Sequence, residues 1–200
     1  MSVNTAARLV VLVSGQGSNL QAMIDACHQN QLNASIVAVI SNRANAYGLQ
    51  RAQLADIPTQ VIIPTKTETR VEYDQRLATC VAGLQADWII LAGWMRLLTT
   101  HFLQHFPKQV INLHPALPGA FPGTRAIERA FMAWQRGEIQ HTGVMLHEVP
   151  DEGVDCGPIL AQTQVPIFAT DSLDSLSRRV QQTEHQLLLH TLQKLVHQRS

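Results

Sequence analysis

Short apolar runs recur along the first half of the chain and alternate with segments that carry apolar residues at helical spacing. The runs are nearly continuous or rich in β-branched residues, as is typical of strands buried on both faces. They cover residues 9–13, 36–40, 61–63, 88–92 and 110–113. The helical patterns between them cover residues 18–30, 47–55, 67–85 and 99–106. This alternation predicts an α/β fold with a doubly wound, mostly parallel sheet, similar to a Rossmann fold.

The second half of the chain has a different pattern. A loop around residues 115–122 leads into a predicted helix at 125–137. Two further strands are predicted at residues 143–149 and 159–165, and a long amphipathic helix at 172–196. No repeat, low-complexity segment or linker interrupts these elements, so residues 1–200 are expected to form a single domain.

Composition narrows the functional classes. Hydrophobic residues make up 46% and charged residues 15% of the chain, which is typical of a globular protein. The fifteen basic and fifteen acidic side chains cancel, so no overall charge favours nucleic acid or a membrane as partner. Cys27, Cys80 and Cys156 are widely separated and predict neither a disulfide framework nor a zinc site. Without a signal peptide or a long apolar run, the chain is expected to be cytoplasmic.

An amide and an imidazole lie two positions apart at the end of the run 110–113. Side chains two apart in a strand point to the same face, so Asn112 and His114 are expected to share one face. Pro115 cannot continue a sheet ladder, which places His114 at the mouth of the sheet. A histidine exchanges protons near neutral pH, and an amide can donate to a developing oxyanion. The pair is a candidate for catalysis, although a structural role is equally typical of such residues.

A glycine-rich turn follows the first apolar run, with the sequence Ser14-Gly15-Gln16-Gly17-Ser18-Asn19-Leu20. Glycines let the backbone approach an anion, and the start of the next helix offers unpaired N–H groups. Leu20 replaces the third glycine of the dinucleotide-binding fingerprint, and the chain has no Gly-Lys-Ser/Thr sequence of a triphosphate loop. The turn therefore favours a site for a single phosphate at Gly17, Ser18 and Asn19. The alternative is a plain turn in which Ser18 caps the helix.

Two further loops are candidates for ligand binding. The segment Leu91-Ala92-Gly93-Trp94-Met95-Arg96-Leu97-Leu98 ends the fourth run, where open α/β sheets gather ligands. Trp94 and Met95 are suited to a slot for a flat ring, although core packing is the commoner role. The loop 151–158 contains Asp151 and Asp155, and a carboxylate close to His114 is expected to raise its pKa. A solvated acidic turn is the alternative.

Polar residues elsewhere give weaker signals. Gln181 and Glu184 lie three apart on the last predicted helix and either bind a polar ligand or face water, the usual outcome. His101 and His105 have the i, i+4 spacing of a zinc pair but no third ligand, so no metal is expected. A role at the surface or as a helix cap is expected for His101 and His105 and for the other histidines apart from His114: His28, His141, His147, His185, His190 and His197.

Five motifs occur together in one order: Ser14-Gly15-x-Gly17-Ser18-Asn19-Leu20, Leu91-Ala92-Gly93-x-Met95-Arg96, Ile111-Asn112-x-His114-Pro115, Asp155-x-Gly157-Pro158-Ile159 and Val180-Gln181-x-x-Glu184-His185. Over nearly its whole length the chain resembles the glycinamide ribonucleotide formyltransferases of purine biosynthesis. The Asn-x-His-Pro and Asp-x-Gly motifs mark the wider folate-dependent formyltransferase family. The glycine-rich turn and the Gln-x-x-Glu pair are more specific to this member.

The resemblance implies transfer of a formyl group from 10-formyltetrahydrofolate to the amine of glycinamide ribonucleotide, without a metal. The matching residues imply a catalytic set of Asn112, His114 and Asp155. They imply phosphate binding by Gly17, Ser18 and Asn19, and ribose or glycinamide binding by Pro115, Gln181 and Glu184. They imply folate binding by Leu91, Met95, Arg96, Leu97, Leu98, Asp151 and Asp155. A monomer or homodimer acting on small molecules is expected.

Four positions depart from the family pattern. Ala116, Pro118 and Gly119 stand in a loop that usually reads His-Pro-Ser-Leu-Leu-Pro, and Arg125 stands where a histidine often follows. The segment from His147 to Asp155 is one residue longer, through Gly153. These departures fall on the loops expected to surround the folate and leave the catalytic set unchanged.

Two other functions compete with this interpretation. A formyltetrahydrofolate hydrolase or a methionyl-tRNA formyltransferase shares the wider motifs, but their additional domains are not expected in 200 residues. The chain also lacks the basic patch that tRNA binding favours. A phosphate-ligand sensor of the same fold class needs only the glycine-rich turn. Such a sensor has no use for Asn112, His114 and Asp155 together.

Overall fold

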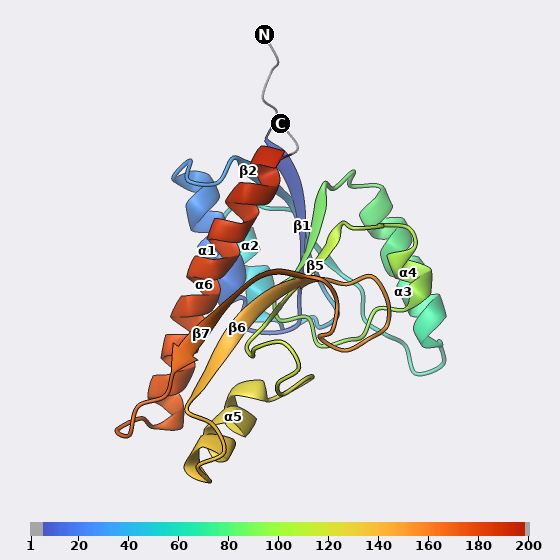
Figure 1. Ribbon diagram of the computed structural model, residues 1–200. Helices are drawn as coiled ribbons and strands as arrows, with labels where there is room; N and C mark the ends of the chain where they lie inside the picture. Colours follow the sequence, from blue (N-terminus) through green and yellow to red (C-terminus); the bar gives the residue numbers. More distant parts are fainter. Residues whose placement is uncertain (1–5, 199–200) are drawn as a thin grey trace.

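The computed structural model of the protein describes residues 6–198 and contains a seven-stranded sheet in the order β3-β2-β1-β4-β5-β6-β7 (Figure 1). The strands are β1 (Ala7–Val13), β2 (Ala34–Ser41), β3 (Thr59–Val61), β4 (Trp88–Leu91), β5 (Val110–His114), β6 (His141–Glu148) and β7 (Ile159–Pro166). The first five are parallel, whereas β6 pairs antiparallel with both β5 and β7. The predicted α/β fold with a mostly parallel sheet is confirmed.

Helices cover both faces of this sheet (Figure 1). They are α1 (Ser18–His28), α2 (Tyr47–Leu54), α3 (Arg70–Ala82), α4 (Thr100–Leu103), α5 (Ala126–Gln135) and α6 (Leu173–Gln198). Alternate residues of β1 enter different cores: Val11 joins the core under α1 and α6, and Val10 the core under α3 and α4. The central strands are continuous apolar runs because both of their faces are buried.

Differences from the predicted elements lie mainly at the edge of the sheet and in one short helix. The apolar run 61–63 predicts a buried strand, but β3 ends at Val61, and Val61 and Ile63 are exposed. An edge strand pairs with one neighbouring strand and can leave one of its faces in solvent. A run of apolar residues therefore does not predict where such a strand begins and ends. The helix predicted at 99–106 is only the four-residue α4. Residues 6–198 contain no helix that is both long and apolar enough to cross a membrane. The single domain over residues 1–200 stays a prediction.

The order of the strands places a crevice at the edge of the sheet formed by the carboxyl ends of the parallel strands. β2 and β4 pair on opposite sides of β1, so the sheet extends from β1 first to one side and then to the other. Ligands of open α/β folds bind at such a switch point, outside the carboxyl ends of the strands. The turn after β1, the loop after β4 and the end of β5 all reach this edge. The candidate site is therefore expected there.

Candidate active site

The turn between β1 and α1 leaves the start of the helix uncapped by any side chain. Gly17 is the N-cap residue, with φ of 69°, and no side chain bonds to the first N–H groups of α1. The alternative in which Ser18 caps the helix is therefore wrong. Gly17 also permits close packing, because a Cβ there would lie 2.7 Å from the Cα of Gly48. The free N–H groups and the helix dipole make this turn suitable for an anion.

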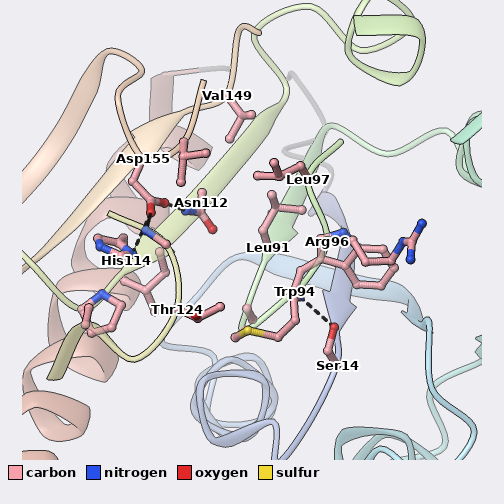
Figure 2. Close-up of a pocket in the computed structure, with 18 of the residues that line it drawn as sticks. Ser14, Leu91, Trp94, Arg96, Leu97, Asn112, His114, Thr124, Val149 and Asp155 are labelled. Carbon is pink, nitrogen blue, oxygen red and sulfur yellow. Dashed lines mark hydrogen bonds and ion pairs between the residues drawn. The ribbon is translucent and has the colours of Figure 1, made fainter. Parts of the chain in front are cut away.

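A cavity of about 610 Å³ joins this turn to the ends of β4 and β5. Figure 2 shows Leu91, Trp94 and Leu97 on one side and Asn112, His114 and Asp155 on the other. The acidic loop 151–155 closes a further side. The residues predicted for phosphate and folate binding all line the cavity: Gly17, Ser18, Asn19, Leu91, Met95, Arg96, Leu97, Leu98, Asp151 and Asp155.

The loop after β4 is held by a buried hydroxyl. Ser14 Oγ accepts a hydrogen bond from Met95 N at 2.8 Å and donates to Asn42 Oδ1 at 2.7 Å. Trp94 is 7% exposed and belongs to the core, as its alternative role predicted. All three of Trp94, Met95 and Leu97 line the cavity, but only Met95 and Leu97 stay about half exposed. Exposed apolar side chains in a concave site favour a ligand with an apolar ring.

Asp155 connects the two candidate side chains of β5. Its Oδ2 lies 3.2 Å from His114 Nδ1, and its Oδ1 accepts a hydrogen bond from Asn112 Nδ2 at 2.9 Å (Figure 2). The backbone N–H of Gly123 donates to Oδ2 at 2.7 Å. The structure thus brings together three residues that the sequence separates by up to 43 positions. Asp155 has a positive φ of 52°, a conformation that Asp and Asn tolerate better than most residues.

His114 is buried between two acceptors. Its Nδ1 faces Asp155 Oδ2, and its Nε2 lies 3.2 Å from the carbonyl oxygen of Phe121. A neutral imidazole has one N–H, so both contacts are hydrogen bonds only when the ring is protonated. Burial lowers the pKa of His114 below its usual value, although Asp155 and the Phe121 carbonyl act in the opposite direction. The carboxylate raises the pKa of His114, as the sequence predicted, but burial outweighs this contribution and the net shift is downward.

A second histidine, which the sequence did not single out, lies in the same cluster. His147 pairs with Asn112 across β5 and β6 and is 2% exposed, so the expected surface role is wrong. Its Nδ1 lies 2.8 Å from the carbonyl oxygen of Glu148, which leaves Nε2 to accept from Asn112 Nδ2 at 3.1 Å. Burial raises the pKa of Asp155, but the Gly123 N–H and the charge of His114 hold it below the usual value.

Comparison with known proteins gives the family. The formyl transferase family matches residues 7–192. Phosphoribosylglycinamide formyltransferases from Dictyostelium discoideum and Schizosaccharomyces pombe are 43% and 45% identical, covering 94% and 95% of this chain and 97% of each relative. The crystal structure of glycinamide ribonucleotide transformylase 1 from Symbiobacterium toebii superposes with a TM-score of 0.90 at 35% identity, covering 98% of this chain and 90% of that one. The chain belongs to the phosphoribosylglycinamide formyltransferases. It is accordingly a transferase, as the motifs implied.

The acidic loop of this formyltransferase turns at Gly153. Asp151 Oδ1 accepts the N–H of Gly153 at 2.8 Å, which closes a tight turn. Glu152 binds the starts of α4 and α3, where it accepts from Thr100 N at 3.0 Å and pairs with Arg70 at 3.2 Å. The loop is therefore anchored at two points, by Glu152 and by Asp155.

The long helix α6 contributes one of its two predicted residues to the cavity. Glu184 lines it and accepts a hydrogen bond from Asn19 Nδ2 at 3.3 Å, so the expected water-facing role is wrong for Glu184. Burial raises the pKa of Glu184 to about 7, and the Asn19 contact opposes this rise. Gln181 is exposed and is not part of the cavity lining. Pro115 does line the cavity, next to His114.

Residues 6–198 contain no group of three or more His, Cys, Asp or Glu side chains that is placed to hold a metal ion. His101 and His105 contact each other edge to face, with ring centroids 5.5 Å apart on α4 and its following turn.

Proposed function

We propose that this formyltransferase moves the formyl group of 10-formyltetrahydrofolate to the amine of glycinamide ribonucleotide. The observation that supports this most is one cavity that joins the uncapped start of α1 to the Asn112–His114–Asp155 cluster. A phosphate-bearing substrate and an apolar ring system fit its two ends. The enzyme acts on these small molecules in the cytoplasm, as a monomer or homodimer, with no nucleic acid or membrane as partner.

The reaction begins when the amine nitrogen attacks the formyl carbon and creates a tetrahedral intermediate with a negative oxygen. Asn112 donates to that oxygen, a contribution of about 3–4 kcal/mol per donor in other enzymes. The positive charge of protonated His114 also stabilises it, while the two ring N–H groups stay on Asp155 and the Phe121 carbonyl. Asp155 keeps His114 oriented and favours its protonated form. It also relays, through water, the proton that the attacking amine nitrogen loses to the folate nitrogen, which departs as its bond to the formyl carbon breaks. Holding both substrates in one cavity supplies much of the remaining acceleration.

Asn112 must exchange one of its contacts before it can donate to the oxyanion. In this structure its Nδ2 group faces both Asp155 Oδ1 at 2.9 Å and His147 Nε2 at 3.1 Å. The contact with His147 is the weaker, because a neutral ring nitrogen is a poorer acceptor than a carboxylate. We therefore assign the N–H that faces His147 to the oxyanion.

The remaining roles follow the walls of the cavity. Gly17, Ser18 and Asn19 bind the phosphate, and Glu184 with Pro115 binds the ribose and glycinamide part. A carboxyl group with a pKa of about 7 can both donate and accept, which suits a pair of hydroxyls. Leu91, Met95, Arg96, Leu97, Leu98, Asp151 and Asp155 surround the pterin. Gln181 is exposed, so the ribose contact is assigned to Glu184 alone on α6.

Formyl transfer is expected to outrun hydrolysis by at least about a hundredfold, because a positioned amine competes with water as the nucleophile. The test measures consumption of 10-formyltetrahydrofolate by the purified protein with and without glycinamide ribonucleotide. Rapid consumption that depends on the amine supports the transferase. Equal rates in both reactions would assign the chain to the hydrolases, and no consumption in either would favour a ligand sensor.

Ser18→Ala and Asn19→Ala are expected to weaken binding of the nucleotide and to leave binding of the folate unchanged. Each lost charge-assisted hydrogen bond costs about 1.5–3 kcal/mol, or roughly tenfold or more in KM for the nucleotide. Asn19→Ala also frees Glu184, so its effect should depend on pH near 7, whereas that of Ser18→Ala should not. Steady-state kinetics in which each substrate is varied in turn separate the effect on nucleotide binding from the effect on folate binding. Ser172→Ala, at the start of α6, is the control, and equal rises in both KM values would contradict a phosphate site.

A further inference from the structure

A tight turn formed by Phe121, Pro122 and Gly123, here called the clamp turn, contacts both ionisable partners of the catalytic pair. The Phe121 carbonyl oxygen lies 3.2 Å from His114 Nε2. Two residues later, the Gly123 N–H donates to Asp155 Oδ2 at 2.7 Å. One turn thus presents an acceptor to the imidazole and a donor to the carboxylate, the groups that the charged forms of both residues require.

The clamp turn has an unfavourable backbone conformation. Phe121 has a φ of 49° and Gly123 a φ of 78°, and a bulky residue at positive φ is rare unless its surroundings hold it there. A side chain at Gly123 would be strained by the same backbone. The turn therefore needs an interaction that compensates for this conformation.

Arg129 on α5 supplies that interaction. Its Nη2 atom donates to the carbonyl oxygens of both Phe121 and Pro122, each at 2.6 Å. Its guanidinium carbon also lies 6.0 Å from the centre of the Phe121 ring. Hydrogen bonds from a charged donor are stronger than neutral ones, so two of them on adjacent carbonyls hold the turn firmly.

Arg129 acts from outside the cavity. The described residues that line the cavity include Gly123, Thr124 and Arg125 but not Arg129, Phe121 or Pro122. Arg129 therefore does not contact a substrate in the cavity, and it can affect the reaction through the clamp turn or through its charge. We propose that Arg129 is a positioning residue, which holds the clamp turn so that it keeps His114 protonated and Asp155 oriented.

This proposal rests on the catalytic role of His114 and Asp155 stated above, but it makes a prediction that is independent of activity. The charged and titratable groups that face His114 are Asp155 from the acidic loop, His147 from β6 and Arg129 from α5. The positive charge of Arg129 by itself lowers the pKa of His114, whereas the Phe121 carbonyl raises it. If Arg129 acted by charge alone, its removal would raise the pKa of His114. If it holds the turn, its removal frees the carbonyl and the pKa falls.

Arg129→Met keeps much of the side-chain volume and removes both hydrogen bonds. We expect kcat to fall by about tenfold to a hundredfold, the effect of losing hydrogen bonds to a charged group, with both KM values nearly unchanged. We also expect the imidazole NMR titration of His114 in the ligand-free protein to shift to lower pH. The amide hydrogen of Gly123 should exchange faster with solvent, since its bond to Asp155 is loosened.

Arg129→Lys and Arg136→Met complete the design. A lysine can reach one of the two carbonyls, so Arg129→Lys should recover part of the lost kcat and of the His114 shift. Arg136 follows α5 and pairs only with exposed Glu138, so Arg136→Met should change none of these readouts. If Arg129→Met is poorly folded, the Lys variant supplies the same comparison.

The proposal is overturned if a folded Arg129 variant shows a raised or unchanged His114 pKa, or unchanged exchange of the Gly123 amide. Both measurements use the protein without substrates. They therefore remain decisive even if the wild-type enzyme proves inactive toward glycinamide ribonucleotide, which would count against the proposed function instead.

Discussion

Asp155→Asn is expected to lower kcat by about 10³- to 10⁴-fold, comparable to the effect of changing the buried Asp of a serine-protease triad to Asn. The backbone should tolerate the change, because asparagine also adopts the positive φ of 52° found at this position. The loss of the negative charge, by contrast, should disrupt the hydrogen bonds at this position. Asp155 receives only donors, from Asn112, Gly123 and the His114 imidazolium, so the NH₂ group of an asparagine must oppose one of them.

The same substitution should lower the pKa of His114. Burial already lowers this pKa, and Asp155 is the main group that opposes burial. Without the carboxylate, the imidazolium is less populated at neutral pH and the proposed proton path through Asp155 is lost. We expect both KM values to change little, because the interactions affected are formed mainly in the transition state. A pKa measured for two groups only 3.2 Å apart belongs to the pair until each site is resolved.

Asp151→Asn is the matched control for this experiment. Asp151 lies in the same loop and bonds only to the N–H of Gly153, so its loss of charge leaves His114 unaffected. Its kcat should stay within about tenfold of the wild type, the cost of one local hydrogen bond. The measurements are single-turnover kinetics of both variants and imidazole NMR of His114. Retention of most turnover by Asp155→Asn, or a His114 titration that does not move down, would show that the carboxylate has been misassigned.

The central strands could be predicted from the sequence because burial on both faces leaves a continuous apolar run. β1, β4 and β5 each coincide with such a run over most of their length, and their carboxyl ends determine where a ligand binds. The pattern fails for β3, whose exposed Val61 packs against no second layer. It also overestimates α4, where apolar Phe102 and Phe106 share the core although the helix ends between them.

The candidate site could be predicted only in part, since contacts between distant segments leave no local signal. Asn112 and His114 follow from period-two spacing, whereas the choice of Asp155 over Asp151 rests on the family resemblance. His147 was missed because its position depends on the antiparallel register that pairs it with Asn112. The position of His147 next to Asn112 can be predicted once the register between β5 and β6 is known, but not from the residue type alone. The clamp turn was missed as well, since a phenylalanine gives no indication of a positive φ.

Asn112→Leu is expected to lower kcat by about 10²- to 10³-fold, the usual cost of removing one oxyanion donor. Leucine has a similar size but cannot donate a hydrogen bond, so the reaction loses the N–H that we assign to the oxyanion. Asp155 loses the donor that lies 2.9 Å from its Oδ1. Gln109→Leu is the control, because Gln109 precedes the opposite end of β5 and donates only to the carbonyl of Ala86. Its kcat should stay close to that of the wild type.

Asn112→Asp separates the loss of the donor from the loss of the amide shape. The new carboxylate would lie beside that of Asp155, and two such groups so close cannot both ionise, so they share a proton. The shared proton supplies an O–H donor only while it is bound. The residual turnover of Asn112→Asp should therefore rise as the pH falls, whereas that of Asn112→Leu should not. Turnover of Asn112→Leu within tenfold of the wild type would mean that His114 alone stabilises the oxyanion and that Asn112 only orients Asp155. A pH profile of Asn112→Asp identical to that of Asn112→Leu would mean that the two carboxylates do not share a proton.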